Sequence, residues 1–295
     1  MSSSADAAPA MASNPKFIFF TDFDGTVTTA DSNDWMTDNL GFGRERREEL
    51  NKEVLSGTSH FRDTFQKMLD SVDTPFDECV RLLEANIKLD PYFKEFYTWA
   101  RENNIPVIIL SGGMTPVISN LLDTLLGNGT WDIQIVSNDV QVAPGKESIN
   151  EKAGWTIKYH DDSIHGHDKS IEIRKYSSLP NRPTLFYAGD GVSDLSAAKE
   201  TDLLFAKADK GKHSHSLTHT LSLSLSLSLS LSLSLSFFPS APGIRSNPPC
   251  TDLVTYCENE NVPFVTFRDW STIFQTCKDI VAGKVTVQES AKGRI

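Results

Sequence analysis

Residues 17 to 28 read Phe-Ile-Phe-Phe-Thr-Asp-Phe-Asp-Gly-Thr-Val-Thr. An apolar run leads directly into two aspartates, Asp22 and Asp24, which are separated by one residue. This pattern predicts a buried strand that ends in a pair of carboxylates. Ligands of open α/β sheets bind at the carboxyl ends of the strands. Because uncompensated carboxylates are costly to bury, the pair predicts cation binding or phosphate chemistry at this edge.

Three further motifs place phosphate-binding or acidic residues after a strand-like run or in a loop. They are Ser111-Gly112-Gly113 after the apolar run 107–110, Lys169 within Gly-His-Asp-Lys-Ser (166–170), and Asp190 and Asp194 within Gly-Asp-Gly-Val-Ser-Asp (189–194) after the apolar run 185–188. Taken alone, each has an ordinary explanation: Ser111 and Asp194 as helix caps, Lys169 as a solvated cation. Their order along one chain favours a shared site.

In this order the four motifs resemble those of the haloacid dehalogenase superfamily of phosphoryl-transfer enzymes. The resemblance implies a Rossmann-like, doubly wound α/β core with a small helical cap domain of the type called C1. The chain pattern agrees, because strand-like and helix-like segments alternate after residue 104, which predicts a parallel sheet covered on both faces. We expect the core at residues 16–30, 102–210 and 252–284, and the helical cap at 31–101.

The resemblance also implies a role for each motif residue. Asp22 would be the nucleophile that forms an aspartyl-phosphate, and Asp24 the general acid and base. The phosphoryl oxygens would be bound by Ser111, by Lys169 and by the Gly112 amide at the start of a helix. The cofactor would be Mg²⁺, with Asp22, the Asp24 carbonyl and Asp190 as ligands and Asp194 supporting them or binding through water.

The substrate depends on the cap. Asp31 stands where phosphoserine phosphatases recognise the serine amine, but Met68 and Ser193 replace the arginine and asparagine expected there. Stretches along most of the chain, among them Asp31-Ser-Asn-Asp and Leu40-Gly-Phe-Gly, resemble the fungal polyol phosphatases. Asp31, Asn33 and Asp34 would then accept hydrogen bonds from substrate hydroxyls, although the same cluster also suits a helix cap.

We therefore expect a magnesium-dependent phosphatase that hydrolyses small phosphate monoesters, with polyol phosphates first. The alternatives are a phosphoserine phosphatase, a diketo-methylthio-phosphopentane phosphatase of methionine salvage, a phosphomutase, and an inactive product. The expected partner is a small phosphorylated metabolite, and the sequence does not indicate an oligomeric state.

Residues 211–251 interrupt the α/β alternation with a low-complexity tract in which Leu-Ser repeats from Leu221 to Ser236. Such a repeat is what a CT dinucleotide tract encodes, and codons for Gly211-Lys212 and for Cys250-Thr251-Asp252 can contain a splice donor and a splice acceptor. Our hypothesis is a retained intron, whose removal joins Lys210 to Asp252 in frame. The alternative is a genuine disordered loop insertion, and a translated segment that disrupts the sheet would give the inactive product.

The composition of the chain limits the other classes of function and of cellular location. The 295 residues are 39% hydrophobic, enough for a sizeable core, and carry a net charge of −11 without a concentrated basic region. We therefore expect neither nucleic-acid nor membrane binding. The four cysteines show no metal-binding spacing, and residues 1–15 have the features of neither a signal nor a transit peptide. We expect a cytoplasmic protein with a disordered start at 1–15 and a tail at 285–295.

Overall fold

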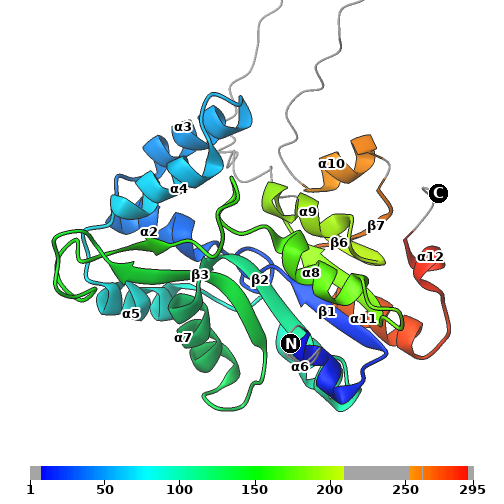
Figure 1. Ribbon diagram of the computed structural model, residues 1–295. Helices are drawn as coiled ribbons and strands as arrows, with labels where there is room; N and C mark the ends of the chain where they lie inside the picture. Colours follow the sequence, from blue (N-terminus) through cyan, green and yellow to red (C-terminus); the bar gives the residue numbers. More distant parts are fainter. Residues whose placement is uncertain (1–7, 209–252, 261, 292–295) are drawn as a thin grey trace, which may run out of the picture.

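A seven-stranded sheet forms the centre of the computed structural model, which describes residues 8–208, 253–260 and 262–291 (Figure 1). In chain order the strands are β1 (Phe17–Thr21), β2 (Val107–Met114), β3 (Gln134–Val142), β4 (Trp155–Lys158), β5 (Thr184–Gly189), β6 (Leu203–Lys207) and β7 (Phe264–Phe267). Their order in the sheet is β4-β3-β2-β1-β5-β6-β7, and among the described residues the β3–β4 pair alone is antiparallel. The predicted α/β class with a parallel sheet is confirmed.

Both faces of the sheet are buried, which explains why its central strands are apolar throughout. Alternate residues of β1 enter opposite clusters: Ile18 and Phe20 on one face, Phe19 on the other. The first face packs against α8 (Lys169–Ser177), α9 (Leu195–Ala198) and α10 (Leu253–Glu260). The second packs against α6 (Phe93–Glu102), α7 (Thr115–Leu126) and α11 (Trp270–Val281).

The strand order reverses at β1. The chain passes from β1 to β2 and β3 on one side, then returns to β5 and β6 on the other. The carboxyl ends of β1, β2 and β5 therefore meet at the topological switch point, where ligands of such sheets bind. Asp22 and Asp190 directly follow β1 and β5, and Ser111 lies near the carboxyl end of β2.

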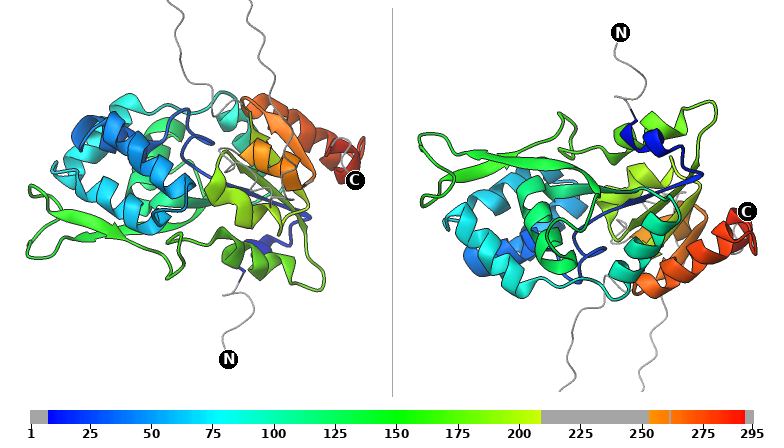
Figure 2. Two further views of the ribbon diagram at one scale, coloured as in Figure 1. Left: turned by 90° about the horizontal axis from the view of Figure 1, so that it is seen from above. Right: turned by 90° about the horizontal axis from the view of Figure 1, so that it is seen from below.

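Five helices lie between β1 and β2, and we call the first four the cap (Figures 1 and 2). They are α2 (Ser32–Leu40), α3 (Arg44–Leu55), α4 (Phe61–Asp70) and α5 (Phe76–Asn86). Their buried side chains are continuous with the core cluster on the second face of the sheet. The fifth helix of the insertion, α6, belongs to the core, because Phe93 and Phe96 lie 4.7 and 4.9 Å from the Trp270 ring of α11. The expected cap boundary at residue 101 was therefore too late.

The cap also contacts a hairpin that the sequence did not indicate. Strand β3 continues to Val142 and pairs there with β4, and β4 packs against α4. The Thr156 hydroxyl lies 2.7 Å from an Asp70 carboxylate oxygen and 2.6 Å from the Gln66 amide nitrogen. The antiparallel edge strand thus supports the cap from the core.

Both ends of the described chain are more ordered than expected. A 3₁₀ helix, η1 (Pro9–Ser13), follows the buried Ala8 and packs on the first face of the sheet. A short helix, α12 (Val287–Ser290), begins with a capping box between Thr286 and Glu289. The predicted disorder of 1–15 is therefore wrong for residues 8–15, while 1–7 and the insertion 211–251 lie outside the described residues. Among the described helices, none has the length and apolar character needed to cross a bilayer.

Candidate active site

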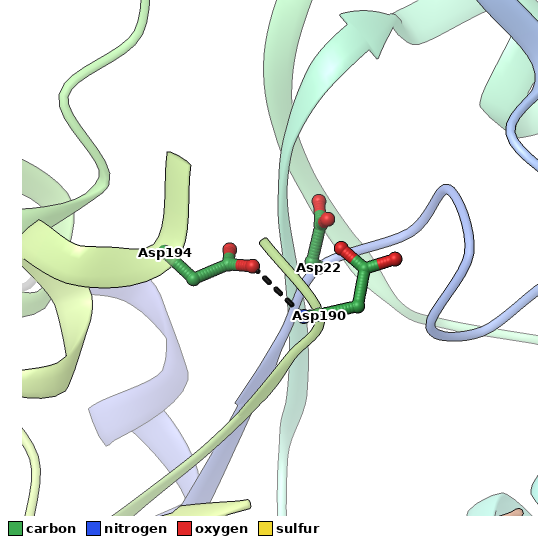
Figure 3. A group of neighbouring side chains, drawn as sticks. All are labelled: Asp22, Asp190 and Asp194. Atoms are coloured by element: carbon green, nitrogen blue, oxygen red, sulfur yellow. Dashed lines mark hydrogen bonds between the residues drawn. The ribbon is translucent and has the colours of Figure 1, made fainter. Parts of the chain in front are cut away.

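Three buried carboxylates converge at the switch point. Oxygen atoms of Asp22, Asp190 and Asp194 all lie within 4.8 Å of one another. Asp22 follows β1 and Asp190 follows β5, and Figure 3 shows their carboxylates close together above the strand ends, with Asp194 approaching from the side. A compact set of hard oxygen donors suits a divalent cation such as Mg²⁺. The predicted metal residues are thus brought together.

Asp194 differs from the other two because protein donors occupy both of its oxygens. Its Oδ1 accepts hydrogen bonds from Lys169 Nζ (2.7 Å) and from the Tyr187 hydroxyl. Its Oδ2 accepts from the backbone amides of Asp190 and Gly191, each at 3.0 Å. Asp194 therefore fits the role of holding the loop and Lys169 better than that of a direct metal ligand.

Lys169 connects the nucleophile candidate to this loop. It is the first residue of α8, whose N-cap Asp168 accepts from the Ser170 amide. Its buried ammonium lies 2.8 Å from Asp22 Oδ1. Burial acts to lower the pKa of Lys169, but the carboxylates of Asp194 and Asp22 outweigh it and raise that pKa above its usual value. The residue is a fixed cation beside Asp22.

The pKa of the Asp22 carboxyl is set by opposing influences. Burial raises its pKa to about 7 against the attraction of Lys169, and the charges of Asp194 and Asp190 raise it further. A cation held among these carboxylates favours their ionised form. Cation binding and ionisation of the Asp22 carboxyl are therefore coupled at this site.

Asp24 is held separately, by the start of the cap. The Ser32 amide donates to its Oδ1 (2.8 Å) and the Asn33 side-chain amide to its Oδ2 (2.9 Å). Asp31 caps α2 by accepting from the Asn33 and Asp34 amides, which fixes this helix start. Burial and the Asp31 charge raise the pKa of Asp24 well above its usual value. A carboxyl that retains its proton suits a general acid.

The phosphate-binding motif lies in an irregular strand end. Strand β2 continues to Met114 with a register shift between Ser111 and Met114, and α7 begins only at Thr115. Gly112 therefore belongs to the strand end, and its predicted place at a helix start is wrong. The Gly113 amide donates to Ser111 Oγ (3.0 Å). A Cβ on Gly113 would lie 3.0 Å from an Asp24 oxygen, so a glycine permits this close approach.

A cavity of about 550 Å³ joins these groups to the cap. Its floor includes Asp22, Asp24, Ser111, Gly112, Lys169 and Asp190, and its rim includes the predicted substrate residues Asp31, Asn33 and Met68 and also Ser193. The cap side adds an apolar wall of Val54, Phe61, Phe65 and Met68. Among the described residues that line the cavity, Lys169 is the only lysine or arginine.

Two residues of the site were not predicted from the sequence. Tyr187 of β5 donates to Asp194, and its place in an apolar strand gave no functional signal. His167 lines the cavity although its side chain is only 1% exposed, and neither ring nitrogen has a hydrogen-bond partner. Its position two residues before Lys169 was the one available indication. Asn33 was expected to contact substrate, but its amide nitrogen orients Asp24.

Comparison with known proteins agrees with this geometry. A family model described as haloacid dehalogenase-like hydrolase matches residues 19–199. The polyol phosphate phosphatase PYP1 of Saccharomyces cerevisiae is 44% identical over 283 residues, which cover 93% of this chain and 98% of that protein. The Pdp3-interacting factor 1 of Schizosaccharomyces pombe is 43% identical over 266 residues, covering 89% and 95%.

The fold has counterparts among solved structures. A substrate-bound phosphoserine phosphatase superposes with a TM-score of 0.50 at 18% identity, covering 65% of this chain and 86% of that one. At this identity the similarity concerns the fold alone. Together with the family match across the four motifs and the full-length similarity, it completes the assignment that the motifs predicted. The chain belongs to the haloacid dehalogenase-like hydrolase family.

Proposed function

We propose that this hydrolase is a magnesium-dependent phosphatase of small phosphate monoesters, and that it acts through an aspartyl-phosphate on Asp22. The observation that carries the proposal is the convergence of Asp22, Asp24 and Lys169 on one cavity floor, with Asp190 beside Asp22. A nucleophile, a protonated acid and a fixed cation are the groups that phosphoryl transfer requires.

The residues act in two steps. An Asp22 oxygen attacks phosphorus as the ester P–O bond breaks, and the departing oxygen takes the proton of Asp24. Asp24, now a carboxylate, then removes a proton from a water molecule that attacks the phosphorus and releases Asp22 and inorganic phosphate. Lys169 and Ser111 stabilise the equatorial phosphoryl oxygens throughout. Mg²⁺, held by Asp22 and Asp190, would neutralise the negative charge that Asp22 and the phosphoryl group bring together.

Polyol phosphates are the proposed substrates. The support is the similarity to the yeast protein named for that activity, and a cavity whose one lysine or arginine side chain, among the described lining residues, already pairs with Asp22 and Asp194. Neutral hydroxyl groups need no such counter-charge, and oxygens of Asp31, Asn33 and Asp34 lie at the rim to accept from them. Phosphoserine, in contrast, would bring a carboxylate toward an apolar and acidic wall.

A methylthio-substituted ketopentane phosphate is the second candidate. The specific support for it is the apolar wall of Val54, Phe61, Phe65 and Met68, which could cover a thioether tail. We further propose a cytoplasmic location, in keeping with the three described cysteines, Cys79, Cys257 and Cys277, which are buried and for which no disulfide is found among the described residues.

The test is a substrate panel with purified protein and Mg²⁺. It should contain glycerol and other polyol phosphates, phosphoserine, a methylthio ketopentane phosphate and sugar phosphates, with released phosphate as the readout. We expect the highest kcat/KM for polyol phosphates, loss of turnover with EDTA, and recovery with Mg²⁺. Higher kcat/KM for phosphoserine would overturn the substrate proposal, and isomerised product without phosphate release would indicate a mutase.

The nucleophile is tested by Asp22→Asn. We expect turnover to fall below a few per cent for every substrate, because an amide oxygen cannot form an acyl-phosphate. The matched control is Asp162→Asn, an exposed aspartate outside the cavity lining, which should leave activity unchanged. Substantial activity of Asp22→Asn would contradict the assignment.

A further inference from the structure

Asn138 is a buried amide behind the phosphate-binding motif, in the strand that neighbours β2. It lies in β3, its residue is 1% exposed, and it does not line the cavity. Its Nδ2 donates to the Gly112 carbonyl at 2.7 Å, and its Oδ1 accepts from the His160 amide at 2.8 Å. The partners fix the orientation of the amide group, because a carbonyl only accepts and a backbone N–H only donates.

The Gly112 carbonyl belongs to the same peptide plane as the Gly113 amide, which donates to Ser111 Oγ (3.0 Å). Asn138 therefore orients one end of a rigid group whose other end contacts the Ser111 hydroxyl. A peptide between two glycines rotates easily when no contact holds it. The register shift of β2 also interrupts the regular pattern of hydrogen bonds between β2 and β3 at this point. The Asn138 bond supplies the missing restraint.

The direction of each bond matters for the chemistry. Since Ser111 Oγ accepts from Gly113, its own proton remains available, and no acceptor for it is found among the described residues. That proton can point into the cavity, which Ser111 lines. A phosphoryl oxygen carries negative charge and only accepts, so a hydroxyl set as donor is the form that binds it.

We propose that Asn138 is a positioning residue for phosphoryl transfer: it fixes the Gly112–Gly113 peptide, which sets the Ser111 hydroxyl as a donor to the transferring phosphoryl group. This inference rests on the proposed phosphatase function. A peptide flip at this point would direct the Gly112 carbonyl elsewhere and remove the Gly113 donor from Ser111. Hydrogen bonds linked in series strengthen one another, so the effect of Asn138 passes to Ser111.

The test uses the variant Asn138→Asp, whose carboxylate keeps an acceptor for the His160 amide but has no donor for the Gly112 carbonyl. We expect kcat/KM for p-nitrophenyl phosphate to fall about 10- to 100-fold, as for other displaced catalytic contacts. The Ki of vanadate, an oxyanion that mimics the transferring group, should rise by a similar factor. Asn138→Ala should act in the same direction and replaces the aspartate variant if that one does not fold.

A double-mutant cycle with Ser111→Ala separates positioning from stability. If Asn138 acts through Ser111, adding Asn138→Asp to Ser111→Ala should lower kcat/KM by less than threefold. Two results would overturn the inference. One is a double variant whose fold-loss in kcat/KM equals the product of the losses of the two single variants, and the other is an Asn138 variant with a lower Tm but unchanged kcat/KM and vanadate Ki. The control Thr115→Val removes a hydroxyl that donates to the Asn138 carbonyl (3.2 Å) without touching Gly112, and should keep wild-type kinetics. Absence of phosphatase activity in the wild-type protein would instead reject the proposed function.

Discussion

At the scale of single residues, the two aspartates of the opening motif differ because different elements hold them. Asp22 lies beside a fixed ammonium and two further carboxylates, whereas Asp24 is held by donors from the start of α2. Environment rather than residue type thus separates the proposed nucleophile from the proposed proton carrier. The cap helix that restricts the cavity also orients the acid, which links substrate enclosure to proton transfer.

The role of Asn33 can be tested directly. In Asn33→Ala, Asp24 Oδ2 loses its side-chain donor, and we expect kcat to fall about tenfold or more because the carboxyl is no longer held in place. The free energy of unfolding should fall by about 1 kcal/mol, the usual net value of one hydrogen bond. Steady-state kinetics and urea denaturation measure the two effects. Asn39→Ala, on the exposed side of the same helix, is the control and should change neither.

The environment of His167 predicts how the stability of the protein changes with acid. Burial, with Lys169 and His160 nearby, lowers its pKa to about 3, while Asp161 and Asp168 oppose this shift only in part. The folded protein therefore keeps His167 neutral where the unfolded chain binds a proton, and stability is lost as pH falls below the unfolded value of about 6.5. At about 1.4 kcal/mol per pH unit, the loss reaches about 2 kcal/mol at pH 5.

The corresponding experiment compares wild type with His167→Gln by urea denaturation at pH 7.5 and pH 5. Relative to His167→Gln, the wild type should lose about 2 kcal/mol of unfolding free energy when the pH is lowered from 7.5 to 5. The exposed His60, changed to glutamine, is the control and should show no such shift. A pH-independent difference between wild type and His167→Gln would mean that His167 is charged in the folded protein.

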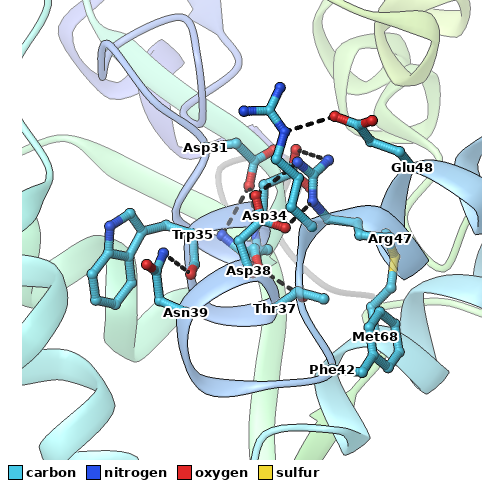
Figure 4. A network of polar contacts seen from close by, with 12 residues as sticks. Asp31, Asp34, Trp35, Thr37, Asp38, Asn39, Phe42, Arg47, Glu48 and Met68 are labelled. Carbon is cyan, nitrogen blue, oxygen red and sulfur yellow. Dashed lines mark hydrogen bonds and ion pairs between the residues drawn. The ribbon is translucent and has the colours of Figure 1, made fainter.

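At the scale of elements, the cap depends on one buried arginine. Arg47 of α3 contacts both Asp38 oxygens, with Nε at 2.6 Å and Nη2 at 2.9 Å, and Nη1 lies 2.7 Å from Asp34 Oδ2 (Figure 4). The Arg47 side chain is 11% exposed, and both aspartates belong to α2. This bidentate, largely buried ion pair connects α3 to the helix that orients Asp24.

We expect Arg47→Met to lower the free energy of unfolding by about 1–3 kcal/mol, because Asp38 loses a buried charged partner. The KM should rise more than kcat falls, since the cavity wall shifts while the strand-end residues stay in place. Arg46→Met removes a pair with Glu49 whose arginine side chain is 51% exposed, and should change the free energy of unfolding much less than Arg47→Met does. Equal effects of the two substitutions would argue against a special role of the buried contact.

At the scale of the whole molecule, the crossover between β6 and β7 contains the insertion. The described chain stops at Ala208 and resumes with α10, whose Leu253 and Cys257 are fully buried against the first face of the sheet. Strands β6 and β7 are parallel neighbours. The flanking elements thus form a complete strand–helix–strand unit without residues 211–251.

Deletion of 211–251 should therefore be tolerated. The remaining Asp209, Lys210 and Asp252 form a loop of usual length between β6 and α10. We expect equal or higher Tm, unchanged kcat/KM and a larger soluble fraction, because an alternating Leu-Ser tract of low charge favours aggregation. A variant with a glycine–serine linker of the same length controls for loop closure. Lower stability of the deletion than of both longer forms would show that the segment is part of the fold.

By itself the sequence determined the parallel part of the sheet and, through resemblance to a known family, the identity of the motif residues. Buried parallel strands need unbroken apolar runs, and their carboxyl ends must face one edge, so Asp22, Ser111 and Asp190 could be placed together from local patterns alone. These features depend on short-range periodicity and on a topology that few connections allow.

Tertiary structure alone decided the contacts between segments distant in the chain. Three contacts show this: the Lys169 bond to Asp194, the Asn138 bond to Gly112, and the pairing of Arg47 with Asp38. Each joins two elements that no local sequence pattern brings together. The same holds for the β3–β4 hairpin, which is stabilised by the cap helix it touches, and for the assignment of α6 to the core. Hydrogen-bond partners and ion pairs are set by packing in three dimensions, which is why the sequence named the reacting groups but not those that position them.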